Sequence, residues 1–514
     1  MRAKAIMIQG TGSDVGKSVL ATALCRIFAQ DGYRVAPFKA QNMSNNSDVT
    51  PDGGEISRAQ SEQAKAAGIA PSVLMNPILL KPMTDVGAQV VVLGKPVGTM
   101  TAREYQAYKP TLLHVITQSL EALRRQTDIL VIEGAGSPAE INLKADDLVN
   151  MWVAKQLNAP VVLVGDIDRG GVFAQLVGTM ELLDESEREL VRGFVINKFR
   201  GDPTLLTSGL QWLEEKYRRP VFGVLPYLHD LDLAEEDSLP HRPAQFPSNG
   251  ALLRPATGGT SQRRALTIHV VRLPRMSNFT DFDALRREPD VHLQFLDAPP
   301  PDAALPDAII LPGTKSTAAD LSFVRQRQLD GYLHRCREAG GEVIGICGGF
   351  QMLGRRLLDP DLLEATTAEV EGLGWLPLDT RFHREKAVCH VRGIHVDSGL
   401  PVVGYEIHMG RGEPPRVRRP VVQITQRSNQ PAHDEDGLRS EDGRVWGTYL
   451  HGLFETPAFR RWWLNRLRQR RGLPPLPPSN EAQSALAYDR LAAVVREHLN
   501  LKALYQVIGL DGAR

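Results

Sequence analysis

The first half of the chain alternates short apolar runs with longer amphipathic segments. The apolar runs predict buried strands, and the amphipathic segments between them have helical spacing. The clearest strands are Ala5–Gln9, Ile129–Glu133, Val161–Asp166 and Val191–Asn197. Repeated strand and helix units indicate a parallel sheet that is covered by helices on both faces. Ligands of such sheets bind at the carboxyl ends of the strands.

The same alternation resumes in the second half of the chain. Strands are predicted at Leu266–Val271, Ala308–Leu311 and Glu342–Ile346, with a helical segment at Ala318–Glu338 before the last of them. The predicted fold class is therefore α/β, with two doubly wound sheet domains. A helical tail at Ala482–Leu504 is expected to pack on the second of these domains.

The segment between the two halves has a different composition. Ser238–Arg264 is rich in Pro, Gly, Ser and Arg and has no periodicity, which is typical of a linker. We therefore expect a first domain at 1–237, a linker at 238–264, a second domain at 265–460 and a C-terminal helical extension at 461–514.

Composition and charge argue against several classes of protein. The 514 residues include 60 Lys and Arg and 60 Asp and Glu, so no net charge favours nucleic acid or an anionic membrane as a partner. No apolar run has the length of a membrane span, and no signal peptide follows Met1. The cysteines form no C-x-x-C pair and are too scattered for a disulfide framework or a zinc site. These are Cys25, Cys336, Cys347 and Cys389. We expect a cytoplasmic protein.

A glycine-rich loop follows the first strand and precedes an amphipathic helix, which is the expected context of a P-loop. Its backbone N–H groups would bind the phosphates of ATP, and Lys17 would reach the β- and γ-phosphates. The Ser18 hydroxyl would ligate Mg²⁺. The first domain is therefore predicted to be P-loop NTPase-like, with ATP and Mg²⁺ as cofactors. The nucleotide-binding residues are Gly10, Thr11, Gly12, Ser13, Asp14, Val15, Gly16, Lys17 and Ser18.

Polar residues at the ends of other strands are further candidates for this site. Glu133 ends one strand and could hold Mg²⁺ directly or through water. Asn197 ends another strand and could face the adenine, while Asp166 and Asp168 follow a third. Asp48, in a loop, is a second candidate metal ligand. Each residue taken alone could equally be a capping or turn residue, but the shared placement at strand ends favours binding.

The segment after the strand Val35–Phe38 is rich in amides. So many amides beside a phosphate site would suit a substrate that carries many carboxylates and amides, and the alternative is an Asn- and Ser-rich turn. The candidate substrate-binding residues are Lys39, Gln41, Asn42, Asn45 and Asn46.

The run Val343–Gly354 has the pattern of a nucleophile elbow. Cys347 stands in Gly-Ile-Cys-Gly-Gly, between a predicted strand and a helical segment. The glycines permit the sharp turn, and a helix N-terminus favours a thiolate. The alternative is a buried cysteine beside a glycine-rich turn. The N–H groups of Gly313 and Gly348 would form an oxyanion hole, although Gly313 could instead precede a simple helix cap at Thr314 or Ser316.

A cysteine nucleophile needs a base. His451 ends the strand-like run Trp446–Leu450 and is the candidate, with His383, His390 and His408 as alternatives.

The first domain resembles a known family of amidating enzymes. Its P-loop is similar to the G-T-x-x-x-V-G-K-[ST] loop of dethiobiotin synthetase and the cobyrinic-acid amidases, which activate a carboxylate with ATP. Pro37–Asn46, Asn76–Pro82 and Asp166–Phe173 resemble the cobyric acid synthase family in particular. The related a,c-diamide synthases have a different loop after their lysine, so the amides of this chain argue against that activity.

The second domain resembles class I glutamine amidotransferases. Tyr449–Phe454 matches their histidine motif, and this resemblance selects His451 as the base. A glutamate commonly stands two positions after that histidine, but this chain has Leu453 there. We therefore expect either a Cys347–His451 dyad or a weak substitute at Glu455. Gly404–Arg411 also resembles the cobyric acid synthase family and is expected near the domain interface or the substrate, with a plain strand and turn as the alternative.

The resemblance implies ATP- and glutamine-dependent amidation in cobalamin biosynthesis. The substrates would be L-glutamine and a corrinoid, adenosylcobyrinic acid a,c-diamide, amidated at its b, d, e and g carboxylates through acyl phosphates. One alternative is the same chemistry on another carboxylate. A ParA/MinD-like ATPase switch is a second alternative, but it leaves the cysteine domain unexplained. Homo-oligomer formation stays open.

Overall fold

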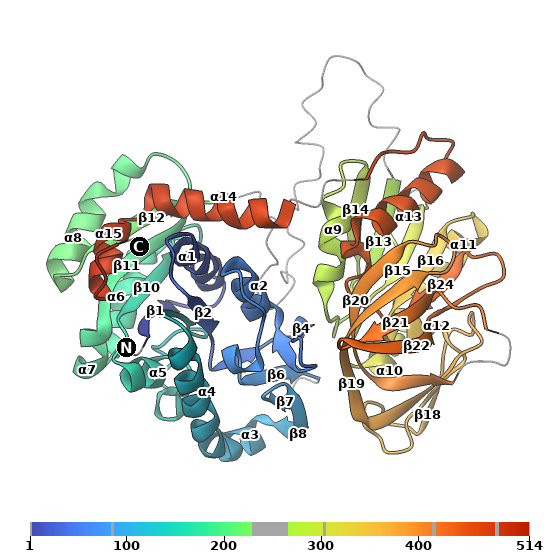
Figure 1. Cartoon of the computed structure of the whole chain (residues 1–514), viewed down its shortest axis with the longest axis horizontal. Coiled ribbons are helices and arrows are strands. Elements are labelled where there is room, and N and C mark those ends of the chain that lie inside the picture. Colours follow the sequence, from blue (N-terminus) through green and yellow to red (C-terminus); the bar gives the residue numbers. More distant parts are fainter. Residues whose placement is uncertain are drawn as a thin grey trace.

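The computed structural model describes residues 3–83, 87–228, 266–301, 305–413, 418–478 and 483–512. These residues form two α/β lobes that lie side by side (Figure 1). The predicted linker 238–264 lies outside the described residues. Within the described ranges, no helix has both the length and the apolar character needed to cross a bilayer.

The first lobe is built on a six-stranded parallel sheet with the strand order β12-β11-β10-β1-β9-β2. Alternate side chains of the central strand enter different cores: Met7 joins the core on one face, and Ile6 and Ile8 join the core on the other. This confirms the parallel sheet predicted from the apolar runs. Its strands are β1 (Lys4–Gly10), β2 (Val35–Phe38), β9 (Ile129–Glu133), β10 (Val161–Asp166), β11 (Val191–Phe199) and β12 (Val221–Pro226).

Helices and two small sheets complete this lobe. The helices are α1 (Lys17–Gln30), α2 (Arg58–Ala66), α3 (Ala102–Tyr108), α4 (Leu113–Gln126), α5 (Met151–Leu157), α6 (Val172–Leu182), α7 (Glu185–Leu190) and α8 (Thr207–Tyr217). A four-stranded sheet contains β3 (Gln41–Met43), β6 (Ile78–Pro82), β7 (Gly87–Val92) and β8 (Lys95–Thr101), and a two-stranded sheet contains β4 (Ser47–Val49) and β5 (Glu55–Ser57). The small sheets lie on the side of the lobe that faces the second lobe (Figure 1).

The second lobe contains the other predicted sheet, with the order β14-β13-β15-β16-β24-β23. All its pairings are parallel except β23 with β24. The helix predicted at Ala318–Glu338 is two helices, because Gln328 between them adopts a left-handed φ of 57°. The strands are β13 (Leu266–Val271), β14 (Val291–Leu296), β15 (Ala308–Leu311), β16 (Glu342–Ile346), β23 (Leu438–Arg439) and β24 (Val445–Thr448), and the helices are α9 (Asp283–Arg286), α10 (Thr317–Gln326), α11 (Leu329–Glu338), α12 (Gly348–Leu353) and α13 (Pro457–Arg470).

A further, largely antiparallel sheet in this lobe was not predicted. Its long strands β19 and β20 pair with each other and end near the first lobe (Figure 1). The sheet contains β17 (Arg356–Leu358), β18 (Glu369–Glu371), β19 (Asp379–His395), β20 (Pro401–Glu413), β21 (Val422–Arg427) and β22 (Gln430–Asp436).

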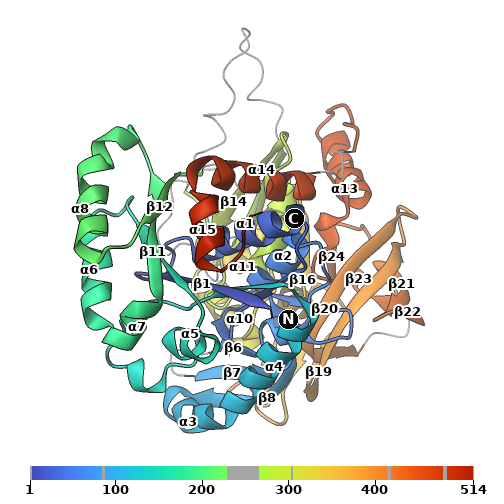
Figure 2. The same ribbon diagram turned by 60° about the vertical axis from the view of Figure 1, so that its left-hand side comes forward.

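The C-terminal tail packs on the first lobe, so the prediction that it packs on the second was wrong. Helices α14 (Gln483–His498) and α15 (Leu501–Val507) lie beside α1 (Figure 2). Leu491 and Val495 are fully buried in the core that also contains residues of α1. Ion pairs join Arg26 to Asp489 at 2.7 Å and Arg496 to Asp31 at 2.6 Å. Burial of this apolar helix face decides its position, and the hydrophobic pattern alone does not say which lobe supplies the partner.

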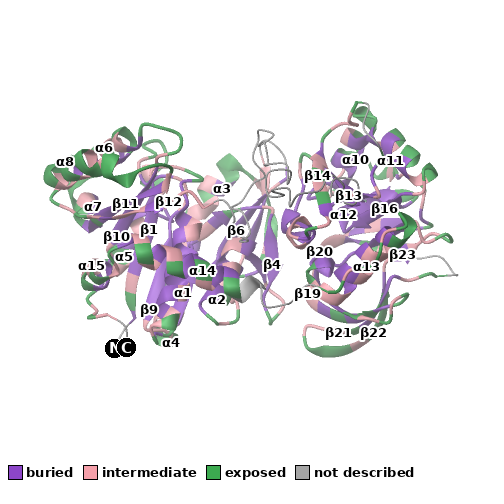
Figure 3. Cartoon of the chain, turned by 90° about the horizontal axis from the view of Figure 1, so that it is seen from above, coloured by how far each residue is buried: buried purple, intermediate pink, exposed green. Residues whose placement is uncertain are grey.

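Short-range contacts join the two lobes around β4. Asn278 of the second lobe accepts a hydrogen bond from the Ser47 N–H at 2.9 Å, and its own N–H donates to the Asn45 carbonyl at 3.4 Å. His390 of β19 contacts the Val49 carbonyl through Nε2 at 2.6 Å. Both β4 and much of β20 are buried where the lobes meet (Figure 3). The interface therefore orders the segment after Lys39 that was predicted to bind substrate.

Candidate active site

The backbone at Cys347 has the strand–turn–helix geometry of the predicted nucleophile elbow. Cys347 follows β16 directly, precedes α12, and has a φ of 50° and a ψ of −108°. Its neighbours must be glycine, because a Cβ at Gly345 would lie 2.6 Å from backbone atoms of Gly349, and one at Gly349 would lie 2.0 Å from the Leu311 carbonyl oxygen. A non-glycine residue at positive φ carries backbone strain, which is concentrated at functional sites. The turn therefore holds the Cys347 thiol at the end of the central strands.

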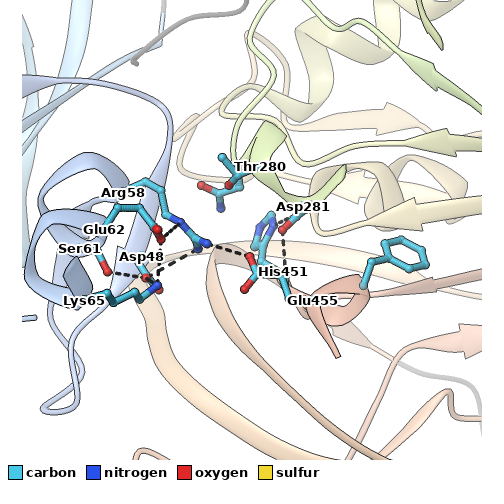
Figure 4. Close-up of polar contacts among 12 residues, drawn as sticks. Asp48, Arg58, Ser61, Glu62, Lys65, Thr280, Asp281, His451 and Glu455 are labelled. Carbon is cyan, nitrogen blue, oxygen red and sulfur yellow. Dashed lines mark hydrogen bonds and ion pairs between the residues drawn. The ribbon is translucent and has the colours of Figure 1, made fainter. Parts of the chain in front are cut away.

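His451 is held by a carboxylate that the sequence analysis missed. The Asp281 carboxylate lies 2.7 Å from His451 Nδ1 and also accepts a hydrogen bond from the Gly452 N–H at 2.8 Å. The side chains of His451 and Asp281 are 1% and 2% exposed. Figure 4 shows this pair beside the first lobe. Among the described residues, the buried Nε2 of His451 has no hydrogen-bond partner, so it is available to the thiol and to the substrate nitrogen.

The charge of His451 follows from this geometry. Burial opposes the charged form, but the Asp281 carboxylate and then the Cys347 sulfur favour it, and together they raise the pKa of His451 to about 10. The imidazole is therefore protonated at neutral pH. An imidazolium beside a sulfur nucleophile, oriented by a carboxylate, has the roles of a catalytic triad.

The two alternatives predicted for the third residue were both wrong. Leu453 is 1% exposed and apolar. The Glu455 carboxylate turns to the first lobe and pairs with Arg58 at 2.8 Å. Asp281 is 170 residues away from His451 along the chain. The residues around the histidine motif therefore could not predict it. The sequence signal that could have indicated it is a carboxylate between Phe279 and Phe282, two residues that are buried in the core.

The predicted oxyanion-hole glycines lie beside this triad. A Cβ at Gly313 would lie 2.7 Å from His451 Cε1, and a Cβ at Gly348 would lie 2.7 Å from Thr314 Cγ2. The two glycine segments therefore approach each other and the imidazole. Ser316, at the N-cap of α10, makes no side-chain capping hydrogen bond. The oxyanion role of both N–H groups stays a prediction that this proximity favours.

The other candidate histidines have different positions. His390 contacts the first lobe, as described above, and His408 stacks on Tyr449 with ring centroids 4.1 Å apart. His408 also lines the cavity beside Cys347, but within the described residues its nearest carboxylate is Glu406, at 3.7 Å. The Asp281 contact therefore favours His451 over His408 as the candidate base.

The P-loop of the first lobe has the predicted context between β1 and α1. Gly16 adopts a φ of 96°, and a Cβ at Gly10 would lie 2.4 Å from Val15 Cγ2, so both positions require glycine. Lys17 Nζ donates to the Gly12 carbonyl at 2.8 Å, which curls the lysine over its own loop. Asn197 Nδ2 donates to the Val15 carbonyl at 2.8 Å. Asn197 thus supports the P-loop backbone in this structure, and its contact with adenine stays a prediction.

Glu133 and Ser18 lie together at the end of the first sheet. The Ser18 hydroxyl donates to Glu133 Oε1 at 2.8 Å, and Lys39 Nζ lies 2.7 Å from the same oxygen. Gln63 of α2 donates to Oε2 at 2.5 Å. Burial opposes ionisation of Glu133, but the Lys39 charge and these hydrogen bonds lower its pKa. A buried carboxylate next to a hydroxyl fits a hard cation such as Mg²⁺.

Asp48 contacts protein groups in this structure, and its role as a metal ligand stays a prediction that these contacts do not favour. Its carboxylate accepts from the Ser61 hydroxyl at 2.6 Å and pairs with Lys65 at 3.1 Å. Burial opposes ionisation of Asp48, but Lys65 and Arg58 lower its pKa. Ser61 and Lys65 lie on the face of α2 opposite the one that presents Gln63 to Glu133. Asp48 is therefore an ionised carboxylate at the lobe interface, and Lys65 and Arg58 balance its charge.

The other loop candidates also contact protein groups. Gln41 accepts from the Tyr105 hydroxyl at 2.5 Å, and Asn42 donates to Ser57 at 2.6 Å. Asn45 donates to the Pro82 carbonyl at 3.2 Å, and Asn46 accepts from the Thr280 hydroxyl at 3.4 Å. The Asn46 contact reaches the second lobe, whereas the other three lie within the first lobe. The contact of these amides with substrate stays a prediction.

The aspartates after β10 have turn roles. Asp166 accepts from the Asp168 N–H and pairs with Lys198, both at 2.9 Å.

Both halves of the chain match known domain families. Residues 6–241 match the CobQ/CobB/MinD/ParA nucleotide binding domain, and residues 267–459 match the CobB/CobQ-like glutamine amidotransferase domain. The cobyric acid synthase of Desulforamulus reducens is 49% identical over 99% of this chain and 98% of its own length. That of Pelotomaculum thermopropionicum is 48% identical over 100% of this chain and 98% of its own length. Among solved structures, PurLQS from Thermotoga maritima matches 45% of this chain and 98% of its own length, at 17% identity and a TM-score of 0.28.

A P-loop domain joined to a buried Cys–His–Asp site defines the class of nucleotide-dependent glutamine amidotransferases. Within this class, the chain belongs to the cobyric acid synthase family. It is a glutamine-dependent amidoligase with an ATP-binding P-loop domain.

Proposed function

We propose that the chain converts adenosylcobyrinic acid a,c-diamide to cobyric acid by amidating its b, d, e and g carboxylates with nitrogen from L-glutamine. The observation that carries this proposal is the near-complete match to cobyric acid synthases at 49% identity. The buried triad and the P-loop supply the two half-reactions that this amidation needs. The same chemistry on another carboxylate is the remaining alternative.

The second lobe would release ammonia from glutamine. Cys347 Sγ attacks the carbonyl carbon of the side-chain amide, and the oxygen takes up negative charge beside the Gly313 and Gly348 N–H groups. The carbon–nitrogen bond then breaks as the proton of His451 Nε2 passes to the departing nitrogen, which leaves as NH₃. His451 next takes a proton from water, and the hydroxide displaces the sulfur to give glutamate. Asp281 stabilises the imidazolium during both steps.

The first lobe would activate the carboxylate. A carboxylate is a poor acyl donor until its oxygen receives the γ-phosphoryl group of ATP, which makes an acyl phosphate that ammonia can attack. Lys17 would leave the Gly12 carbonyl to bind the phosphates. Ser18 and Glu133 would hold Mg²⁺, which offsets phosphate charge when it is bound. Lys39 pairs with Glu133 in this structure and would have to yield part of this contact.

Ammonia would pass between the lobes through their interface. Free ammonia is mostly protonated at neutral pH, so a shielded route protects its nucleophilic form. Several buried polar atoms on and beside the interface have no hydrogen-bond partner within the described residues. They are His451 Nε2, Tyr405 Oη, Asn45 Oδ1, Asn46 Nδ2 and Gln63 Oε1. Such atoms could bind a small polar molecule in transit.

Mass spectrometry of the corrinoid tests this function. Adenosylcobyrinic acid a,c-diamide is incubated with the enzyme, ATP, Mg²⁺ and glutamine, and each amidation replaces an OH by an NH₂. Four successive losses of about one mass unit are expected, since the proposal names four carboxylates. Unchanged corrinoid, while glutamine and ATP are consumed with another carboxylic acid, would favour the alternative substrate.

A further inference from the structure

The cavity beside Cys347 has a charged lining that the triad mechanism does not use. It has a volume of about 30 Å³, and its lining includes Lys81, Lys315, Lys386 and Glu364 together with Cys347. Three ammonium groups around one small buried cavity are costly unless anionic partners offset them. The partners of each charged side chain therefore indicate which charges a ligand of this cavity would carry.

Lys81 and Lys386 share one partner from the first lobe. The Glu55 carboxylate lies 2.5 Å from Nζ of each lysine, and all three side chains are 3% exposed or less. Glu55 and Lys81 belong to the first lobe, whereas Lys386 lies on β19 of the second. This cluster fixes one side of the cavity across the lobe interface, and one carboxylate leaves it with excess positive charge.

Lys315 has no such partner. It follows Gly313 and Thr314 after β15 and is 7% exposed. Within the described parts of the chain, no carboxylate lies within ion-pair distance of its ammonium group. Burial first, and the charge of Lys386 second, lower the pKa of Lys315 to about 8. Among the residues that the structure describes, Lys315 is therefore a buried cation in the cavity without an ion-pair partner.

Glu364 is the complementary group. Among the described residues, its carboxylate accepts one long hydrogen bond, 3.4 Å, from the Thr317 N–H, and burial raises its pKa. Lys315 is the largest favourable charge acting on Glu364, but the two groups are not in ion-pair contact. Both line the same cavity. A molecule that carries an anion and a cation at one end can satisfy both.

We infer that this cluster is the receptor for the α-amino acid end of glutamine: Lys315 binds the α-carboxylate, and Glu364 binds the α-ammonium group. This inference rests on the proposed glutaminase function. Glutamine places its amide and its zwitterionic end at opposite ends of a short chain, so an amide at Cys347 leaves the zwitterion among these charges. The Glu55–Lys81–Lys386 cluster closes the receptor across the lobe interface. The small cavity requires side chains to move on entry, which the flexible stems of the lysines allow.

Two substrate fragments test the inference, because each lacks one of the two charges. 4-Aminobutanamide lacks the α-carboxylate, and glutaramate lacks the α-amino group. Glutamate or product release from glutamine and from each fragment is measured with the unmodified enzyme, Lys315→Met and Glu364→Gln. The exposed residues Lys95 and Glu369 supply the matched controls Lys95→Met and Glu369→Gln. Amidation driven by ammonium salts, which uses the other site, is measured in parallel to show that each variant is folded.

A charged hydrogen bond lost from the receptor should lower kcat/KM for glutamine by roughly 10- to 100-fold, mainly through KM. Lys315→Met should lower 4-aminobutanamide turnover far less than glutamine turnover, since that fragment has no carboxylate for Lys315 to bind. Glu364→Gln should likewise lower glutaramate turnover far less than glutamine turnover. The inference is overturned if either variant keeps the unmodified KM for glutamine, or if it lowers turnover of glutamine and its matching fragment equally. An unmodified enzyme that hydrolyses no glutamine would instead contradict the proposed function.

Discussion

Arg58 of the first lobe and Glu455 of the second form an ion pair at 2.8 Å, next to the loop that carries His451. Figure 4 shows this contact between the two lobes. Arg58 begins α2, whose opposite face presents Gln63 to Glu133 at the predicted metal site. The tail reaches the same helix, because Tyr488 donates to Glu62. One short helix therefore contacts Glu133 in the first lobe, Glu455 after His451 in the second lobe, and the tail.

This arrangement predicts that the ion pair couples the two half-reactions. In Arg58→Met or Glu455→Gln, glutamine hydrolysed per amide formed should rise by about fivefold or more, because α2 no longer links the nucleotide site to the His451 loop. Glutamate and amidated corrinoid are quantified in the same reaction. Combining the two changes should add little to either one, since both remove the same contact. Arg103→Met, at an exposed arginine of α3, is the control, and a ratio that stays at the unmodified value would contradict the coupling.

Asp281 should be needed for glutamine hydrolysis but not for amidation from ammonia. Asp281→Asn keeps the shape of the side chain but removes the charge that stabilises the imidazolium. Glutaminase kcat should fall by about 10²-fold or more, while ammonia-dependent amidation persists. The control is Asp283→Asn, two positions further on, whose carboxylate pairs with Arg286. Equal losses from both nitrogen sources would show that Asp281 acts only on the fold.

The raised pKa of His451 predicts a pH-dependent contribution to stability. The folded protein holds this proton more tightly than the unfolded chain, whose histidine has its ordinary pKa of 6.5. The contribution is therefore complete below about pH 6.5 and is lost as the pH rises through about 10. The measurement is the difference in free energy of unfolding between the unmodified protein and His451→Gln. This difference should shrink as the pH rises through that window, and a constant difference would argue against the Asp281 contact.

Cys347→Ala should abolish the use of glutamine and leave amidation from ammonia. The expected reason is that only the glutaminase step needs the sulfur, whereas the acyl phosphate accepts ammonia from any source. Amidated corrinoid is measured with glutamine and with ammonium chloride as nitrogen donors. Cys336→Ala, a second buried cysteine of the same lobe, provides the comparison. Loss of both activities in Cys347→Ala alone would mean that this cysteine is structural.

Lys17→Ala should stop amidation from either donor. Its ammonium group is the P-loop charge expected to reach the phosphates, and no other step replaces acyl phosphate formation. The readout is ADP release together with corrinoid amidation, with ammonia supplied so that the second lobe is bypassed. Near-normal turnover would remove the P-loop from the mechanism.

The sequence alone determined the two sheets, the P-loop and the nucleophile elbow, because each depends on neighbours along the chain. Strands β1, β9, β10 and β16 follow from apolar runs, and the conformations at Gly16 and Cys347 follow from local glycine patterns. Fold class, ATP site and cysteine nucleophile could all be inferred from such local signals.

Only the tertiary structure decided the third triad member, the contacts of Asp48 and the position of the tail. Asp281 meets His451 because two distant segments fold onto the same end of a sheet, and no spacing rule connects them. The charge of Asp48 is balanced by Lys65 on one face of α2. The apolar face of α14 packs against α1. Both contacts join segments that are far apart along the chain. Such contacts depend on where whole elements pack, which the local pattern of residues does not contain.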